Sequence, residues 1–299
     1  MDFRLTKSHE LAQKLFRDFS INEVKPIAQE VDEEERFPSE TVQKMGKYGI
    51  MGIPFPKEYG GQDADILTYV MAVEELSKVC GTTGVVLSAH TSLCSAPIFE
   101  FGTPEQKAKY LPKLNSGEHI GAFGLTEPNA GTDASAQQTI AEKKEDHYLI
   151  NGTKIFITNA GVADIFIVMA MTDKKAGTRG ISAFILEKGM PGFSIGKHEL
   201  KMGIRGSSTC ELIFENVKVP LENLLGQEGK GFGLAMKTLD GGRIGIAAQA
   251  LGIAQGAIDE TVHYVKDRRQ FGKPISAFQN TQFQLADMQT KLDAARLLV

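Results

Sequence analysis

Phe123-Gly-Leu-Thr-Glu-Pro-Asn-Ala-Gly-Thr-Asp133 is the stretch of this chain that says most about its fold. The apolar residues leading into it predict a strand, and the proline, asparagine and glycine that follow predict a turn. Such a turn leaves backbone N–H groups free to face a ligand, and Thr126 and Thr132 add hydroxyls at the two ends of the loop. This combination suits the edge of a neutral heterocycle and a phosphate oxygen, although an ordinary surface loop between strands has a similar composition.

The bulk properties narrow the class of protein. A chain of 299 residues exceeds the usual size of one hydrophobic core, so two or three domains are expected. The net charge of −4 and the absence of a long basic run favour neither nucleic acid nor a membrane surface, and no apolar segment is long enough to span a bilayer. Cys80, Cys94 and Cys210 are widely spaced and odd in number, which indicates reduced thiols in a cytoplasmic protein. The six histidines show no ligand spacing, so no metal site is expected.

Residues 1–118 are predicted to form a helical domain. Leu11, Leu15, Phe16 and Phe19 recur at helical spacing and should share one buried face. Thr103-Pro-Glu-Gln106 has the composition of a helix start, with a capping threonine, a proline in the first turn and a glutamine that completes a capping box.

Residues 119–228 change to short β-rich runs, at 119–126, 147–150, 153–157, 164–171, 181–186 and 211–219. Asn151-Gly152 separates two of them and predicts a tight hairpin turn there. Several short strands with frequent turns predict an antiparallel barrel or sandwich.

Residues 229–299 return to a helical pattern, which residues 270–274 interrupt. The last three residues, Leu297-Leu-Val299, are still in the apolar pattern and include no glycine, proline or cation. We therefore expect this sequence to end inside a helical bundle.

Five motifs, in order along the chain, resemble those of the acyl-CoA dehydrogenase family. After the loop quoted above come Asn151-Gly-Thr-Lys-Ile-Phe-Ile-Thr-Asn159, Lys201-Met-Gly-Ile-Arg-Gly-Ser-Ser-Thr209 with Val217-Lys-Val-Pro220, Leu239-Asp-Gly-Gly-Arg243, and Arg268-Arg-Gln-Phe-Gly272. With Leu87-Ser-Ala-His-Thr-Ser-Leu93, the chain is most similar to bacterial short-chain, butyryl-CoA-type members. The resemblance implies a multi-domain fold of α and β structure: an N-terminal helical domain, a middle antiparallel β-barrel and an incomplete C-terminal helical bundle.

The resemblance also implies FAD as the cofactor and a set of residues that bind it. These are Phe123, Leu125, Thr126, Gly131, Thr132, Phe156, Ile157, Thr158, Arg268, Phe271 and Gln279. Arg268 and Gln279 match family positions that reach the FAD of a neighbouring subunit, and a guanidinium suits a phosphate because it donates two parallel hydrogen bonds. Phe156 stands where many members have tryptophan and keeps the flat apolar face without the indole N–H.

Acyl-CoA contacts are implied for Thr132, Asp240, Gly241, Gly242 and Arg243. The family removes the α-proton with a glutamate that most members carry in a later Tyr-Glu-Gly-Thr segment, which this sequence does not contain. Other members place that glutamate just before the matching arginine, where this chain has Gly242. No catalytic residue is therefore assigned here, and the base is expected beyond Val299. Glu127, next to a proline, is expected to support the turn rather than to remove protons.

The implied function is dehydrogenation of a short acyl-CoA thioester to the 2-enoyl-CoA, with electrons passing to an electron-transfer flavoprotein. A homo-oligomer, a tetramer or dimer of dimers, is implied as well. Two other interpretations stay open. One is a non-catalytic flavin- or acyl-CoA-binding remnant that serves as a docking module, and the other is an acyl-CoA oxidase.

Overall fold

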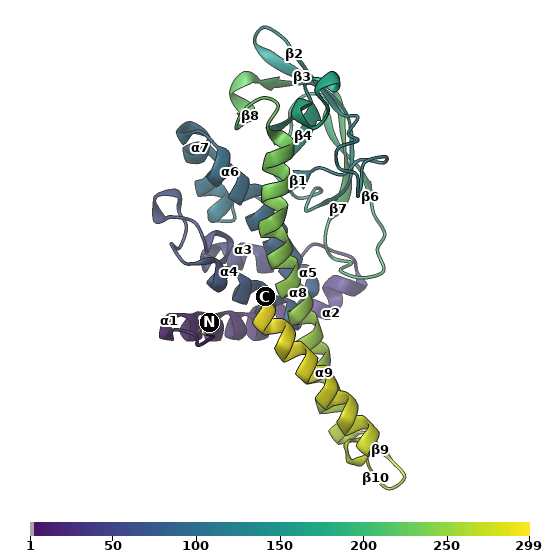
Figure 1. Cartoon of the computed structure of the whole chain (residues 1–299). Coiled ribbons are helices and arrows are strands. Elements are labelled where there is room, and N and C mark those ends of the chain that lie inside the picture. Colours follow the sequence, from purple (N-terminus) through teal and green to yellow (C-terminus); the bar gives the residue numbers. More distant parts are fainter. Residues whose placement is uncertain (1–2) are drawn as a thin grey trace.

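The computed structural model describes residues 3–299, which form a helical part, a β-sheet and a long pair of helices (Figure 1). The helical part precedes the sheet in the chain. Its main helices are α1 (Lys7–Phe19), α2 (Lys25–Glu33), α3 (Ser39–Lys47), α4 (Ile66–Val79), α5 (Gly81–Ser88), α6 (Ala96–Phe101) and α7 (Pro104–Asn115). Two π-helical segments, η1 (Ser20–Val24) and η4 (Ala89–Ser95), and two 3₁₀ turns, η2 (Ile50–Gly52) and η3 (Lys57–Tyr59), connect them.

The predicted helix start at Thr103 is confirmed. The hydroxyl of Thr103 accepts a hydrogen bond from the Gln106 N–H, and the Gln106 side chain accepts one from the Thr103 N–H. The predicted buried face of α1 is only half right. Phe16 and Phe19 are buried, whereas Leu11 is 61% exposed and Leu15 45% exposed. The helix packs on the core through Ala12, Phe16 and Phe19, while Leu11 and Leu15 line a surface cavity.

The sheet contains β1 (Gly121–Gly124), β2 (Ile140–Lys143), β3 (His147–Thr158), β4 (Ile165–Met171), β5 (Ile181–Glu187), β6 (Phe193–His198), β7 (Thr209–Pro220) and β8 (Leu224–Leu225), with a 3₁₀ stretch η5 (Lys174–Gly180) before β5 and a turn η6 (Leu221–Asn223) before β8. The strand order is β6-β7-β3-β2-β4-β5-β8, and β1 also pairs with β4. The sheet is mixed rather than purely antiparallel, because β1 and β2 both run parallel to β4. The antiparallel hairpin of β2 and β3 lies between β1 and β4 in the sequence. After this hairpin the chain comes back beside β1, and β4 runs in the same direction as β1.

Strand β4 explains why the sheet needs cover on both faces. Ile165, Ile167 and Met169 pack towards the helices, in one core with residues of α7 and α8. Phe166 and Val168 point to the other face, where they pack with residues of β3 and β7. Side chains alternate along a strand, so an uninterrupted apolar run such as this one is buried on both faces.

The hairpin predicted at Asn151-Gly152 is wrong. Strand β3 continues through these residues, although its pairing with β7 is irregular between Ile150 and Gly152. The chain reverses earlier, where the Lys144 N–H bonds to the His147 carbonyl at 2.8 Å. Asn151 instead pairs across the sheet, accepting from the Asn216 N–H at 2.8 Å. Gly152 has a φ of +147°, and a Cβ there would lie 2.5 Å from the Thr139 hydroxyl oxygen, so the glycine serves a close approach of two strands.

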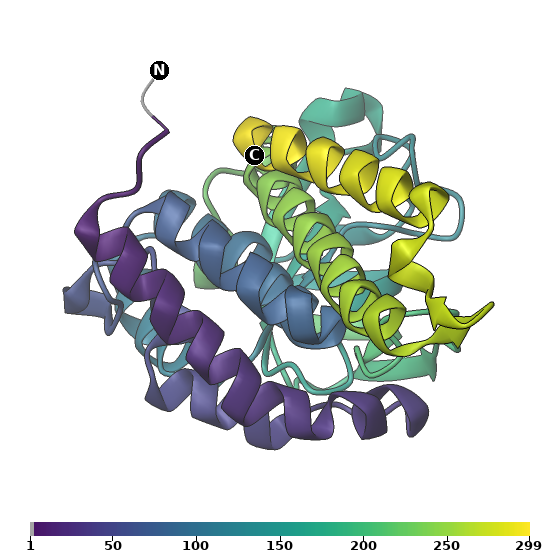
Figure 2. The ribbon, with the colours of Figure 1, turned by 90° about the horizontal axis from the view of Figure 1, so that it is seen from below.

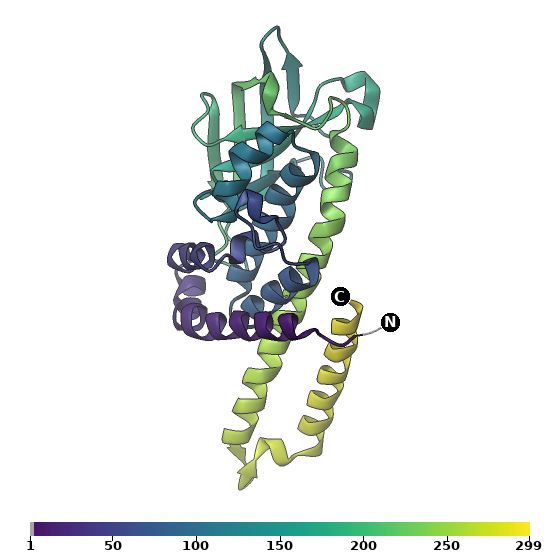
Figure 3. The ribbon, with the colours of Figure 1, turned by 90° about the vertical axis from the view of Figure 1, so that its left-hand side faces the viewer.

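Helix α8 (Gly231–Asp267) links the sheet to the far end of the molecule. It begins beside the sheet, runs along the helical part and continues beyond it (Figures 1 and 3). A small hairpin of β9 (Arg269–Gln270) and β10 (Lys273–Pro274), followed by a turn η7 (Ile275–Ala277), reverses the chain, as the sequence predicts for residues 270–274. Helix α9 (Gln279–Leu298) then returns alongside α8, so the hairpin forms the tip of a projecting helix pair (Figure 3).

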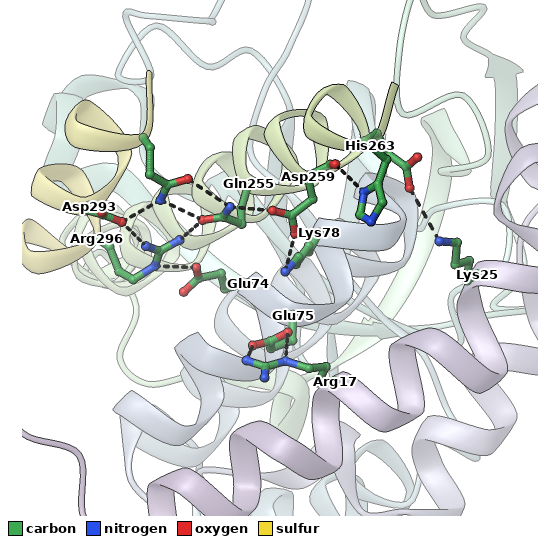
Figure 4. A network of polar contacts seen from close by, with 12 residues as sticks. Arg17, Lys25, Glu74, Glu75, Lys78, Gln255, Asp259, His263, Asp293 and Arg296 are labelled. Atoms are coloured by element: carbon green, nitrogen blue, oxygen red, sulfur yellow. Dashed lines mark hydrogen bonds and ion pairs between the residues drawn. The ribbon is translucent and has the colours of Figure 1, made fainter. Parts of the chain in front are cut away.

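Ion pairs fasten this helix pair to the helical part. Helices α1, α4, α8 and α9 lie close together when the molecule is seen from below (Figure 2). Among residues 3–299, three buried apolar residues, Leu251, Ile258 and Leu292, form the core between α8 and α9. Three charged contacts join the helix pair to the helical part (Figure 4): Lys25 with Glu260, Lys78 with Asp259, and Arg296 with Glu74. A fourth, Arg17 with Glu75, joins α1 to α4 within the helical part.

Candidate functional site

One cavity of about 170 Å³ brings together most of the predicted flavin residues. It is lined by Phe123, Leu125, Thr126, Phe156, Ile157 and Thr158, with Ala89 and Leu93 from η4 and Leu239 from α8. Phe123 lies in β1, Leu125 and Thr126 directly follow it, and the other three residues end β3, so two stretches some thirty positions apart in sequence form its two walls. Sequence reasoning assigned no role in this cavity to Ala89, Leu93 and Leu239, since small and apolar helix residues give no signal that separates a cavity wall from a core.

The wall formed by β3 depends on an irregular backbone at Phe156. Between Lys154 and Ile157 the pairing with β7 shifts by one residue, because three steps on β3 face two steps on β7. Phe156 has a φ of +60°, which is rare for a bulky residue, and its ring is 59% exposed. Backbone strain of this kind persists only where the surrounding structure imposes it and often marks a functional site. Phe156 thus lines the cavity while much of the residue stays exposed.

The chemical character of the cavity fits an isoalloxazine ring. Phe156, Leu125 and Ile157 provide apolar surface, which a planar heterocycle requires. The hydroxyls of Thr126 and Thr158 are half-buried and have no hydrogen-bond partner among residues 3–299, so both are free to bond a ring edge. Neither hydroxyl would have to break an existing hydrogen bond to meet a flavin edge.

Glu127 supports the turn, as predicted, and is not available as a base. Its carboxylate is buried and binds the Lys154 ammonium at 2.7 Å, the Gln138 N–H at 2.5 Å and the Thr139 N–H at 3.0 Å. Burial alone would raise the pKa of this carboxyl, but the charge of Lys154 and the hydrogen bonds outweigh it and hold the pKa below its usual value. Among the residues that the structure describes, no carboxylate lines the cavity.

His90 and Cys94 lie on η4 behind β1 and are part of the core. His90 accepts a hydrogen bond from the Gly121 N–H at 3.0 Å and donates one to the Leu114 carbonyl at 3.1 Å. Burial raises the pKa of the Cys94 thiol to about 12, so this thiol is unreactive. Both residues thus hold the first strand of the sheet against the helices.

Four of the residues predicted to contact acyl-CoA, Asp240, Gly241, Gly242 and Arg243, lie on α8, and the residue before them, Leu239, reaches the cavity. Leu239 lines it, and a Cβ on Gly242 would lie 2.9 Å from Leu93, another lining residue. Position 242 therefore faces the cavity wall and has no room for a side chain unless Leu93 moves. Gly241 lines a separate cavity, while Asp240 and Arg243 are exposed and form an ion pair of 2.5 Å.

Gly131 and Thr132 lie in the exposed turn beyond Glu127, outside the cavity lining. A Cβ on Gly131 would meet nothing within 4 Å, so this part of the loop is open to a ligand but does not enclose one.

The structure places Arg268, Phe271 and Gln279 far from this cavity. Arg268 follows Leu239 by 29 positions along α8 and its C-cap, which corresponds to roughly 40 Å of helix. Phe271 is 92% exposed at the tip of the hairpin and its ring meets that of Phe278. These three residues cannot act on a ligand in the cavity of their own chain.

The comparisons agree with this arrangement of fold and site. Residues 6–118, 122–217 and 229–299 match the N-terminal, middle and C-terminal domains of acyl-CoA dehydrogenases. The chain belongs to the acyl-CoA dehydrogenase family.

Individual relatives match over the whole chain. It is 65% identical to the short-chain specific acyl-CoA dehydrogenase of Clostridium acetobutylicum, over 100% of this chain and 79% of that protein. It superposes on butyryl-CoA dehydrogenase from Megasphaera elsdenii with a TM-score of 0.97 and 55% identity, covering 100% of this chain and 79% of that one. This chain also superposes on a chain in the structure described as the electron transferring flavoprotein of Acidaminococcus fermentans, with a TM-score of 0.98 and 58% identity. The match covers 100% of this chain and 78% of that one.

Residues 3–299 contain neither a candidate metal site nor a candidate membrane span. No cluster of three or more histidine, cysteine, aspartate or glutamate side chains there could hold a metal ion. No helix in that range is both long and apolar enough to cross a membrane.

Proposed function

We propose that this protein is a cytoplasmic, FAD-dependent dehydrogenase of short-chain acyl-CoA thioesters. The observation that carries the proposal is the cavity in which the segment after β1 meets the end of β3, because it combines two free hydroxyls with apolar and aromatic walls. FAD, when bound, supplies the acceptor for the hydride that leaves the β-carbon of the substrate. The similarity to short-chain and butyryl-CoA dehydrogenases supports a preference for butyryl-CoA.

Apolar residues of this chain shape the site and exclude water from it. Leu93 and Leu239 close the cavity on the helix side, which keeps water away from the reacting carbons. The base that removes the α-proton is expected outside these residues, since Glu127 is bound by Lys154 and position 242 is a glycine packed on Leu93.

The proposed electron acceptor is an electron-transfer flavoprotein. The likeness to a chain in a structure described under that name supports it. The exposed ring of Phe156 at the cavity mouth supports it as well, since an electron-transfer partner needs a short path to the flavin edge.

We also propose that the protein is an oligomer in which Arg268, Phe271 and Gln279 bind the FAD of a neighbouring subunit. They lie at the tip of the projecting helix pair, out of reach of the cavity in their own chain. A guanidinium held at such a tip can reach a pyrophosphate only across a subunit boundary.

The full-length protein tests the proposal directly. It should purify yellow with about one FAD per chain and should oxidise butyryl-CoA faster than octanoyl- or palmitoyl-CoA, with an electron-transfer flavoprotein as acceptor. A colourless protein that cannot be reconstituted with FAD contradicts the cofactor. A preference for palmitoyl-CoA contradicts the short-chain assignment. Hydrogen peroxide formed at the rate of turnover in air indicates an oxidase, and FAD binding without turnover of any acyl-CoA indicates a non-catalytic docking module.

A further inference from the structure

A buried lysine lies directly behind the cavity wall. The Lys154 side chain is 0% exposed. Its ammonium donates to the Glu127 carboxylate at 2.7 Å, to the Gln137 side-chain oxygen at 3.0 Å and to the Leu125 carbonyl at 3.1 Å. An ammonium has three hydrogens, so these acceptors use its entire donor capacity.

The charge of this lysine is balanced within the loop that follows β1. Glu127 binds the ammonium with one oxygen and also accepts from the N–H groups of Gln138 and Thr139. Residues along the whole loop from Leu125 to Thr139 therefore bond to one ion pair, that of Glu127 and Lys154. Burying an ion pair costs several kcal/mol of desolvation per ion, and well-packed apolar residues of similar size are often equally stabilising. The fold alone does not require a charged pair at this place.

The ammonium connects the two walls of the cavity. Its acceptor, the Leu125 carbonyl, belongs to the peptide between Leu125 and Thr126, both of which line the cavity. The backbone of Lys154 lies on β3, two residues before Phe156 and at the start of the bulge. The next residue, Ile155, donates its N–H to the Thr126 carbonyl at 2.9 Å. One side chain and one backbone bond thus set the spacing between the segment after β1 and the end of β3.

We propose that Lys154 is a positioning residue for the flavin, which acts by fixing the peptide between Leu125 and Thr126 against the wall formed by Phe156, Ile157 and Thr158. The proposal rests on the proposed function, since it takes FAD as the occupant of the cavity. Lys154 does not line the cavity and acts through Leu125, while Glu127 holds the ammonium in place.

Three variants of the full-length protein separate positioning from simple stabilisation. Lys154→Met removes the donor to Leu125 and leaves Glu127 buried without its cation. The double variant Lys154→Met/Glu127→Gln removes the donor but leaves no unpaired charge. Glu75→Gln is the matched control, because Glu75 is also a buried carboxylate, bound to Arg17 at 3.0 Å on α4, away from the cavity. For each apoprotein the melting temperature and the FAD dissociation constant are measured, followed by the flavin absorption spectrum at saturating FAD.

Both Lys154 variants should bind FAD at least about tenfold more weakly than the wild type, the effect of losing one charge-assisted hydrogen bond. Their flavin spectra should be shifted. The double variant should recover melting temperature relative to Lys154→Met without recovering FAD affinity. Glu75→Gln should melt earlier with unchanged FAD affinity and spectrum.

Several results would overturn the assignment. An unchanged dissociation constant and spectrum in Lys154→Met refutes it. Recovery of affinity together with melting temperature in the double variant shows that Lys154 only stabilises the fold, and so does a failure of both Lys154 variants to fold. A wild-type apoprotein that takes up no FAD contradicts the proposed function itself, which makes that failure distinguishable from the failure of the positioning role.

Discussion

Acidification should destabilise this protein through one buried imidazole, that of His90. The ring is fully buried between η4, α7 and the start of β1. Its Nδ1 accepts from the Gly121 N–H and its Nε2 donates to the Leu114 carbonyl, so only the neutral ring with its proton on Nε2 satisfies both bonds. A second proton on Nδ1 would face the Gly121 N–H and break the contact that holds β1.

The sign and size of the effect follow from the pKa of His90. Burial lowers this pKa from 6.5 to about 4. The unfolded chain therefore binds more protons between these values, so the stability contributed by the neutral ring is complete above pH 6.5 and is lost as the pH falls towards 4. One pKa unit corresponds to about 1.4 kcal/mol, which makes the loss roughly 3 kcal/mol.

The assay is urea unfolding of the full-length protein at several pH values between 6.5 and 4, with His90→Asn as the comparison. Asparagine can still accept from the Gly121 N–H but does not ionise. At neutral pH the variant should be less stable by about 1–3 kcal/mol, because the Leu114 carbonyl loses its donor. The two stability curves should converge as the pH falls, with the wild type losing roughly 3 kcal/mol more. Parallel curves would refute the reasoning, since they would mean that His90 binds no extra proton on unfolding.

Three further substitutions, one of them with a matched control, test the long helix pair. Gly256→Ala should lower the melting temperature, at a cost of about 1–3 kcal/mol, because a Cβ there would lie 2.1 Å from the Lys78 carbonyl oxygen; Gly233→Ala on the same helix meets nothing within 4 Å and should be neutral or slightly stabilising. Leu292→Ala should cost about 2–5 kcal/mol in urea unfolding, since Leu292 is one of the few buried residues between α8 and α9, and an unchanged midpoint would show that polar contacts alone hold α9. Arg268→Ala should weaken FAD retention and oligomer stability together, as seen by gel filtration of the yellow protein; loss of neither would mean that Arg268 is only a solvated surface residue.

Local signals in the sequence predicted much of the fold. The capping box at Thr103, the interruption at residues 270–274 and the apolar run of β4 depend on neighbours a few positions away, and all three are confirmed. The Asn151-Gly152 turn failed for the same reason. Its local preference for a hairpin lost to the pairing of β3 with β7 and to the close approach of Thr139, which are both long-range contacts.

The sequence by itself determined the family, the order of the three parts and the two segments that form the cavity walls, because motif composition and periodicity are written along the chain. Only the tertiary structure decided that the Lys154 ammonium joins those walls, that Glu127 is bound rather than free, and that Arg268 lies roughly 40 Å of helix from the cavity of its own chain. These facts depend on burial and on distances between residues remote in sequence. Such quantities are set when the sheet closes on the helices and are not carried by any single motif.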